Sequence, residues 1–181
     1  MKLKLSLKQI TRMALFSSLF IAVQLAIPSL NLPIISVPFT MQTLMVMVIS
    51  VILSPGESSI SVLLYLLIGA LGLPVFNGYQ GGFDMLIGPT SGFLWAFPIA
   101  AFLIGQFKGK STFVRLLIIN VLFGMFLVYL LGAISLSIHQ YLPYGKVLWS
   151  LSIFIPLDLI KALIASLIGS KVEKISKKLN F

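Results

Sequence analysis

The chain has 181 residues, of which 59% are apolar and 9% are charged, and its formal net charge is +9 at pH 7. So little polar surface excludes a soluble globule, and this length leaves room for several membrane spans but hardly for a separate soluble domain. The absence of cysteine excludes disulfides and thiol chemistry, and a single histidine, His139, argues against a histidine-rich zinc site. We therefore expect an all-α integral membrane protein that forms one domain over residues 1–181.

Apolar stretches long enough to be membrane helices recur along the chain, with Pro, Gly or charged residues at every junction. The six predicted helices are residues 13–30, 37–54, 58–76, 89–107, 116–138 and 147–170. The tightest connecting turn is "SPGES" at 54–58. An even number of spans places both termini on the same side of the membrane.

The basic residues lie almost entirely in segments that six spans would place on one side. All but two of the 13 Lys and Arg residues precede residue 13, lie between residues 107 and 116, or follow residue 170. The exceptions are Lys146 and Lys161. Because cytoplasmic segments carry an excess of Lys and Arg, we predict that both termini are cytoplasmic in a cell-membrane protein. The positive charge is then a sign of topology and not of nucleic-acid binding.

The first predicted helix has two features with alternative interpretations. Its basic start and apolar run are also typical of a signal peptide, but the run is long for one and lacks a clear small-residue cleavage site. Ser18, Ala22 and Ala26 recur every fourth residue, so small side chains line one face of the helix. Such a face lets another helix approach closely, either within the bundle or from a partner.

The stretch "LGLPVFNGYQGGFDMLIGPTSGF", which runs from the end of the third predicted helix into the start of the fourth, is too rich in helix-breaking residues to be a lipid-facing helix. It contains Gly72, Pro74, Gly78, Gly81, Gly82, Gly88, Pro89 and Gly92. Irregular backbone at membrane depth is tolerated only where protein buries it or where it lines a cavity, because unpaired amides in hydrocarbon are costly. We expect a loop that folds over or into the bundle, with aromatic side chains around a pocket. The alternative is a plain exposed loop on the outer surface.

Asp158 and Lys161 interrupt the sixth apolar stretch, "FIPLDLIKALIASLIG", at about the middle of the membrane. They are three residues apart and so share one face of the predicted helix. A charge at this depth costs about 2.5 to 3.5 kcal/mol unless it is paired or faces a polar cavity. The two residues either only neutralise each other or line a site for a polar or anionic ligand, and intramembrane charges favour the site. The other polar candidates for it are Gln42, Asn77, Thr90 and Asn120.

The sequence indicates neither catalysis nor a source of energy. It contains no G-x-x-x-x-G-K-[ST] nucleotide-binding pattern, and Asp158 is the only acidic residue within a predicted span. A serine hydrolase centred on Ser91 would need a base, and His139 falls in the outer loop after the fifth span. We therefore expect a protein that binds and translocates a small solute, has no cofactor of its own, and takes its energy from partners.

Three stretches together resemble one known family. The run "LPVFNGYQGGFDMLIGPTSGFLWAFPIAAFLIG", with "VPFTMQTL" before it and "IPLDLIKALIA" after it, is similar to the BioY family. These proteins are the biotin-specific substrate-binding (S) components of energy-coupling factor (ECF) transporters. The resemblance covers nearly the whole chain in length, six spans and order of motifs. The chain departs from the family's G-P-T-G-G-Y pattern at Ser91 and Phe93, which replace a glycine and a tyrosine.

The resemblance implies an S-component-like bundle that captures biotin from outside the cell. It also implies a transmembrane coupling subunit and two ATPase subunits as partners, so that ATP is used by those subunits and drives a rotation of the S component in the bilayer. In such proteins a small-residue face on the first helix docks against the coupling subunit, which here corresponds to Ala22 and Ala26, with Ser18 one turn earlier.

For biotin itself, the residues suggest a division of roles. Asp158 and Asn77 would satisfy the ureido N–H groups, and Lys161 would pair with a ligand acceptor or with the carboxylate. The ring would pack against Tyr79, Phe93 and Trp95, with Gln42 completing the polar lining. The alternative function is a stand-alone facilitator or a proton-coupled carrier for a small anionic vitamin.

Overall fold

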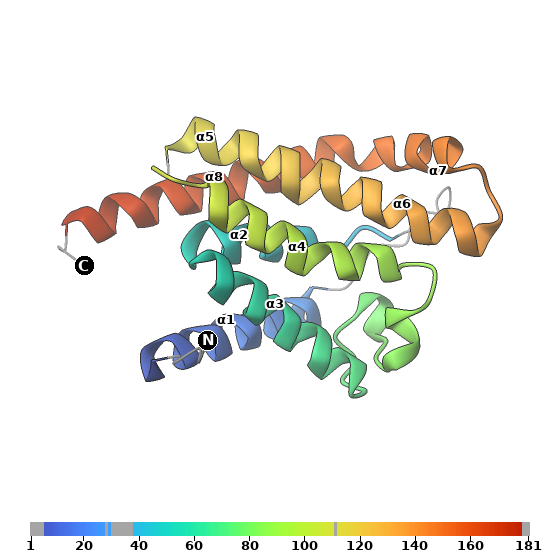
Figure 1. Ribbon diagram of the computed structural model, residues 1–181, viewed down its shortest axis with the longest axis horizontal. Coiled ribbons are helices and arrows are strands. Elements are labelled where there is room, and N and C mark those ends of the chain that lie inside the picture. Colours follow the sequence, from blue (N-terminus) through green and yellow to red (C-terminus); the bar gives the residue numbers. More distant parts are fainter. Residues whose placement is uncertain (1–5, 28, 30–37, 111, 179–181) are drawn as a thin grey trace, which may run out of the picture.

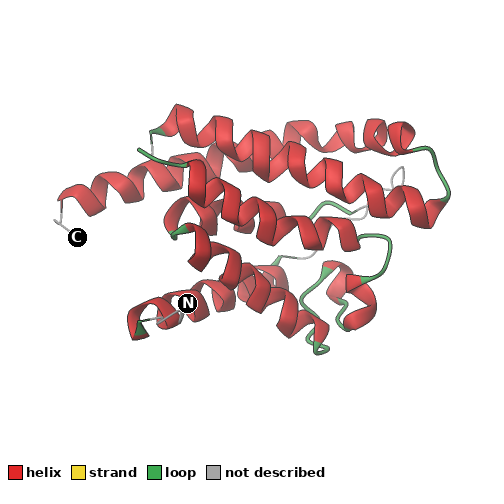
Figure 2. Ribbon diagram, in the orientation of Figure 1, coloured by secondary structure: helices red, strands yellow, loops and turns green. Residues whose placement is uncertain are grey.

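The computed structural model describes residues 6–27, 29, 38–110 and 112–178, and these residues are predominantly helical (Figures 1 and 2). The α-helices are α1 (Leu7–Ala26), α2 (Gln42–Ile52), α3 (Pro55–Ala70), α4 (Ser91–Phe107), α5 (Phe113–Ile119), α6 (Leu127–Gln140), α7 (Tyr144–Ser150) and α8 (Ile155–Lys178). Short 3-10 turns are η1 (Asn77–Tyr79), η2 (Phe83–Leu86) and η4 (Leu151–Phe154), and η3 (Asn120–Phe126) is a π-helical stretch that joins α5 to α6. Within the described ranges no strand occurs, so the all-α prediction is confirmed.

Helices occupy all six predicted stretches, but they differ in length. In the described part of the chain, three continuous helical stretches are long and apolar enough to cross a membrane, namely Leu7–Ala26, Phe113–Gln140 and Tyr144–Ile175. Helices α2, α3 and α4 have 11, 16 and 17 residues. At 1.5 Å per residue even α4 extends only about 26 Å, against a hydrocarbon core of about 30 Å. The six-span topology with cytoplasmic termini therefore stays a prediction.

The predicted ends of the first helix are wrong, because local capping sets them. Helix α1 begins at Leu7 and not near residue 13: the Ser6 hydroxyl accepts the backbone N–H of Gln9, whose side chain accepts the Ser6 N–H in return. It ends at Ala26, since Ile27 is extended, as expected for a residue that precedes a proline. Residue 30, the predicted end, lies outside the described residues.

The second helix is shorter than predicted, and the third begins and ends earlier in the chain than predicted. Helix α2 starts only at Gln42, after the non-helical residues 38–41, and residue 37 lies outside the described residues. Most of the predicted "SPGES" turn is the first turn of α3, because Ser54 and Glu57 form a capping box and Pro55 occupies the first helical position. The connection between α2 and α3 is therefore only two residues long.

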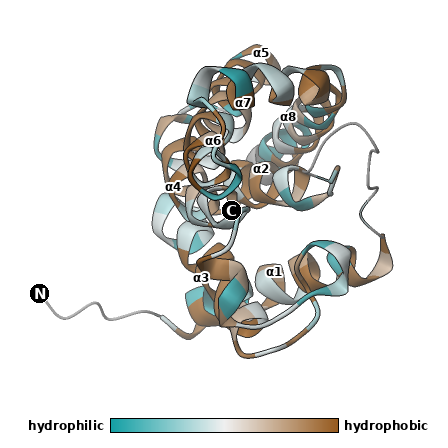
Figure 3. Cartoon of the chain, turned by 90° about the vertical axis from the view of Figure 1, so that its right-hand side faces the viewer, coloured by the Kyte–Doolittle hydropathy of each residue, from teal (hydrophilic) through white to brown (hydrophobic). Residues whose placement is uncertain are grey.

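The helices pack in an order that leaves α1 at the edge of the bundle. Helix α4 packs against α3 and α6, α2 packs against α4 and α8, and α1 packs mainly against α3 (Figures 1 and 3). The start of α1 and the ends of α4 and α8 gather at one end of the molecule (Figure 1). The segment between α3 and α4 lies at the opposite end, together with the connection from α6 to α7. Basic residues therefore concentrate at the first end, as the sequence predicted.

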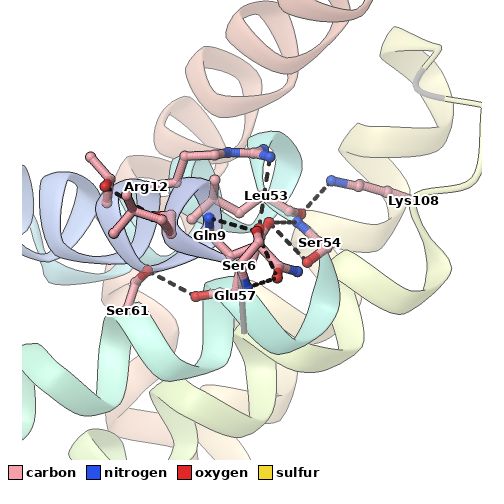
Figure 4. A network of polar contacts seen from close by, with 10 residues as sticks. Ser6, Gln9, Arg12, Leu53, Ser54, Glu57, Ser61 and Lys108 are labelled. Carbon is pink, nitrogen blue, oxygen red and sulfur yellow. Dashed lines mark hydrogen bonds and ion pairs between the residues drawn. The ribbon is translucent and has the colours of Figure 1, made fainter. Parts of the chain in front are cut away.

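A polar network joins four helices at this basic end (Figure 4). Arg12 of α1 lies 3.7 Å from the buried carboxylate of Glu57 on α3. Lys108, at the end of α4, donates to the carbonyl oxygens of Ser50, Val51 and Leu53, which the end of α2 leaves without helical partners. Burial lowers the pKa of Lys108, and nearby Glu173 and Glu57 oppose that shift. The network fixes the ends of α1, α2, α3 and α4 relative to one another.

Glycine lets the segment after α3 pack tightly on that helix. A Cβ at Gly69 would lie 2.3 Å from the ring of Phe76, which therefore sits directly on the backbone of α3. A Cβ at Gly81 would lie 2.4 Å from the carbonyl oxygen of Leu73. In addition, the backbone N–H of Gly82 donates to the Gly69 carbonyl at 2.8 Å. The glycine-rich segment thus packs on α3 at these positions.

Replacing Gly69 by alanine should destabilise the protein, because the ring of the buried Phe76 has to move. Overpacking of this kind costs about 1 to 3 kcal/mol, and we expect the midpoint of thermal unfolding in detergent to fall by several degrees. Gly56→Ala is the matched control, because nothing lies within 4 Å of a Cβ there and the residue is in a helix. Equal midpoints for the two variants would contradict this packing.

Candidate ligand-binding site

A cavity lies among α2, α4, α6 and α8 and is lined in part by the irregular segments before α2 and before α4. Its polar lining residues are Thr40, Gln42, Thr43, Asn77, Thr90, Tyr129, Asp158 and Lys161. Its aromatic lining residues are Phe39, Phe76, Phe93, Phe97 and Phe154. Figure 3 views the bundle from the end that carries the segment between α3 and α4. An apolar wall with a few convergent polar groups is typical of small-molecule sites.

The predicted pair of charges forms a buried salt bridge at this cavity. Lys161 Nζ lies 2.7 Å from Asp158 Oδ1, and each side chain is only 6% exposed. The ammonium group also donates to the Thr40 carbonyl oxygen at 2.6 Å and to Thr43 Oγ1 at 2.9 Å. It lies 4.0 Å from the centre of the Phe39 ring, within range of a cation–π interaction. All three donors of the ammonium group thus have an acceptor.

Asp158 is held by groups from three helices. Besides Lys161 on its own helix, it accepts hydrogen bonds from Thr43 Oγ1 of α2 at 3.3 Å and from the hydroxyl of Tyr129 on α6. A buried ion pair is tolerated only when further hydrogen bonds satisfy both ions. The pair therefore fixes α2, α6 and α8 around the cavity and keeps two charges at its wall.

The late start of α2 supplies one of these partners. Residues 38–41 are not helical, so the carbonyl oxygen of Thr40 is free to accept from Lys161. Irregular backbone is expected at membrane depth only where it is buried or lines a cavity, and here it lines the cavity. Gln42, the first residue of α2, is buried and donates to the hydroxyl of Tyr65 at 2.7 Å.

Asn77 and Phe93 reach the cavity as the sequence predicted. Phe93 lies against Gly132 of α6, where a Cβ would come within 2.2 Å of its ring. Asn77 lies in the short turn η1 between α3 and α4. Its buried Oδ1 has no hydrogen-bond partner among the residues that the structure describes. Buried acceptors are rarely left unpaired, so this atom is a candidate to receive a donor from a ligand.

The structure does not bring Tyr79 and Trp95 to the cavity with the other predicted residues. Trp95 is 48% exposed, donates to the Leu86 carbonyl at 3.0 Å, and borders a separate apolar groove between α4 and α6. It follows Phe93 by two residues, and a helix turns by about 200° over that distance, so the two side chains leave α4 on opposite sides. Tyr79 is 51% exposed and occupies the left-handed region, with φ of 57°.

Three further residues considered from the sequence also lie elsewhere. Asn120 is fully buried, but it does not line the cavity and donates to Ser166 Oγ at 3.0 Å. Ser91 and His139 both border the groove between α4 and α6. His139 Nδ1 is 2.8 Å from the Ser135 carbonyl oxygen, and in the described part of the chain no hydrogen bond joins His139 to Ser91. The groove therefore shows no nucleophile and base in contact.

The small-residue face of α1 points away from the bundle. Ser18, Ala22 and Ala26 are all exposed, whereas the buried residues of this helix are Met13, Ser17 and Phe20. The interpretation that this face packs within the bundle is therefore wrong. The face remains open to another helix, which is the arrangement that a docking surface for a partner requires.

Sequence reasoning missed Thr43 and Tyr129, which both contact Asp158. Thr43 is the residue after Gln42 in "VPFTMQTL", and Tyr129 is a tyrosine in an otherwise apolar helix. Their partners are separated from them by 115 and 29 residues, so only the tertiary fold brings them together. The signal that the sequence offered for both residues was a polar side chain within a predicted span.

A family model described as the BioY family matches residues 1–178 of the chain. The chain belongs to the BioY family. It is 34% identical over 173 residues to the probable biotin transporter BioY of Bacillus subtilis strain 168. The matched region covers 94% of this chain and 92% of the relative. It is 32% identical over 146 residues to the biotin transporter BioY of Thermotoga maritima, covering 81% and 86%. The resemblance inferred from the sequence is confirmed.

A solved structure supports the same relationship at the level of the fold. The crystal structure of the S-component for biotin from an ECF-type ABC transporter is similar to this chain with a TM-score of 0.86 and 32% identity. The similarity covers 96% of this chain and 95% of that one. The helix arrangement of the chain is therefore similar to that of this S-component.

Removing one partner of the buried pair should destabilise the protein even without ligand. In Lys161→Met, Asp158 keeps its hydroxyl partners but loses the opposite charge, and breaking a buried pair costs about 3 to 5 kcal/mol. We expect a clearly lower midpoint of thermal unfolding in detergent. In the double variant Asp158→Asn/Lys161→Met, the loss should be smaller than the sum of the two single losses.

Lys171→Met is the matched control, because Lys171 lies on the same helix but is exposed. It should leave the midpoint nearly unchanged. If Lys161→Met were equally harmless, or if the losses were additive, the two charges would not be stabilising each other.

Proposed function

We propose that the chain captures biotin from outside the cell in the cavity beside Asp158 and Lys161, and that it serves biotin uptake as the S component of an ECF transporter. The observation that carries this proposal is the buried, fully bonded ion pair at the wall of a cavity in a chain of the BioY family. Relatives described as biotin transporters, and the similar solved structure of an S-component for biotin, support biotin as the solute.

The chemistry of biotin suits the groups at this cavity. Biotin has a ureido group with two N–H donors and one acceptor, a thioether ring, and a carboxylate on an aliphatic chain. Asp158 and the unpaired Oδ1 of Asn77 are acceptors for the two N–H groups. Lys161 exchanges one of its present acceptors for the ligand carboxylate or for another ligand acceptor, giving a charge-assisted hydrogen bond.

The apolar part of biotin is assigned to the aromatic residues that line the cavity. Phe93 packs against the ring of biotin, as the sequence suggested. Phe97 and Phe154 take over this role from Trp95 and Tyr79, which lie outside the cavity. Phenylalanine rings offer apolar area without a polar group that would need its own partner. The ring of the ligand is therefore held by burial and the ends by polar contacts.

The distribution of charge supports the orientation of the protein. The described residues Lys8, Arg115 and Lys171 lie on helices that meet at one end of the bundle, where Lys110 lies in the connection between α4 and α5, and by the positive-inside rule this end is cytoplasmic. The segment of residues 71–90, which contributes Asn77 to the cavity, lies at the other end. We therefore place the cavity toward the outer surface, with both termini inside.

Energy is assigned to partner subunits. The chain has no nucleotide-binding pattern, and its acidic residue at the cavity is neutralised by a lysine. We propose that the exposed face of Ser18, Ala22 and Ala26 docks against a transmembrane coupling subunit, which in turn binds two ATPase subunits. The chain itself then needs no cofactor.

Titration calorimetry of the purified protein in detergent tests the ligand and the site. We expect one biotin per chain, and affinity weakened roughly 10- to 100-fold in Asp158→Asn and in Lys161→Ala, because each variant loses charged hydrogen bonds. Lys171→Ala, at an exposed position of the same helix, should bind as the native chain does. A folded native protein that does not bind biotin would reject the proposal.

Uptake of labelled biotin by cells tests the source of energy. Cells without ECF partners that express this chain alone should bind biotin with little accumulation, and coexpression of a coupling subunit with two ATPases should produce ATP-dependent uptake. Strong accumulation by the chain alone would instead indicate a stand-alone or proton-coupled carrier.

A further inference from the structure

Tyr65 of α3 is fully buried and lies behind the wall of the cavity, where it contacts three separate parts of the chain. Its ring stacks on Phe20 of α1, with ring centres 3.9 Å apart and planes 5° apart. The ring also meets the edge of Phe76, with centres 5.7 Å apart and planes at 88°. Phe76 belongs to the segment after α3 and lines the cavity.

The hydroxyl of Tyr65 has two partners, and both belong to the cavity wall or adjoin it. It accepts a hydrogen bond from Gln42 Nε2 at 2.7 Å and donates to the carbonyl oxygen of Val75 at 2.9 Å. Gln42 lines the cavity, and Val75 immediately precedes the lining residues Phe76 and Asn77. One hydroxyl thus joins the start of α2 to the segment that carries Asn77.

The contacts continue from Gln42 to the ion pair. Gln42 Oε1 accepts from Thr40 Oγ1 at 3.2 Å, and the Thr40 carbonyl oxygen accepts from Lys161 at 2.6 Å. The orientation of the Gln42 amide is therefore fixed at both of its ends. Because the Tyr65 hydroxyl supplies the acceptor for the amide N–H, its loss would leave a buried donor unpaired and free to turn toward the cavity.

We propose that Tyr65 is a positioning residue of the biotin site: it fixes Gln42 and residues 75–77 on two walls of the cavity and ties both walls to α1 through Phe20. This inference rests on the proposed function, since it concerns the cavity assigned to biotin. Phe20 is buried on the side of α1 opposite the exposed face of Ser18, Ala22 and Ala26. A displacement of α1 is therefore transmitted to the cavity through packed rings and two hydrogen bonds.

Titration calorimetry with Tyr65→Phe tests the positioning role. This variant keeps the ring, and with it the contacts to Phe20 and Phe76, but removes both hydrogen bonds of the hydroxyl. We expect biotin to bind about tenfold more weakly. Tyr144→Phe is the matched control: it removes an exposed hydroxyl that donates to the Leu130 carbonyl at 3.1 Å, and binding should stay unchanged.

A double-mutant cycle separates positioning from a general loss of stability. If Tyr65 acts through Gln42, then adding Tyr65→Phe to Gln42→Ala should weaken binding by less than threefold beyond Gln42→Ala alone. A merely structural role predicts that the two fold-changes multiply. Multiplying effects, or native affinity in Tyr65→Phe, would overturn the proposal while leaving biotin binding by the native chain intact.

Phe20→Leu tests the link to α1, and it keeps the proposal testable if Tyr65→Phe proves unstable. Leucine stays apolar but cannot stack on Tyr65, so we expect biotin affinity to fall severalfold although Phe20 does not line the cavity. Phe123→Leu is the control, since it removes a stacked pair with Phe107 that lies outside the cavity. Equal affinities in the two variants would refute the link, whereas a native chain without biotin binding would refute the proposed function as well.

Discussion

The buried ion pair of Asp158 and Lys161 is the constraint on which the rest of the site depends. Charges buried inside an apolar helical bundle are tolerated only when every donor and acceptor is satisfied. Four other groups meet this requirement: the Thr40 carbonyl, the Thr43 hydroxyl, the Phe39 ring and the Tyr129 hydroxyl. They come from three segments of the chain, so satisfying the pair also assembles the cavity.

Irregular backbone on two sides of the cavity is the second feature on which the site depends. Residues 38–41 remain non-helical where a full-length span was predicted, and this frees a carbonyl for Lys161. The glycine-rich segment after α3 folds onto the bundle because Gly69 and Gly81 allow close approach. Helices α2, α3 and α4 are consequently short. Residues that could have extended these helices form two irregular walls of the cavity instead, which regular helices could not provide.

The sequence predicted what depends on composition and local pattern: the all-α class, the six helical stretches and the paired charges. It failed where tertiary packing decides. Trp95 lies near Phe93 in the sequence but on the opposite side of α4, and periodicity applied to that helix would have separated them. Tyr129 and Thr43 had no local signal beyond their polarity, because their contacts with Asp158 join distant segments.

The absence of cysteine from the chain offers the most direct test that biotin occupies this cavity. A Thr90→Cys variant carries one thiol on the cavity wall, and His139→Cys carries one at an exposed position outside it. The rate of maleimide labelling should fall strongly with biotin in Thr90→Cys and stay constant in His139→Cys. Equal labelling of Thr90→Cys with and without saturating biotin would place the ligand elsewhere and contradict the account.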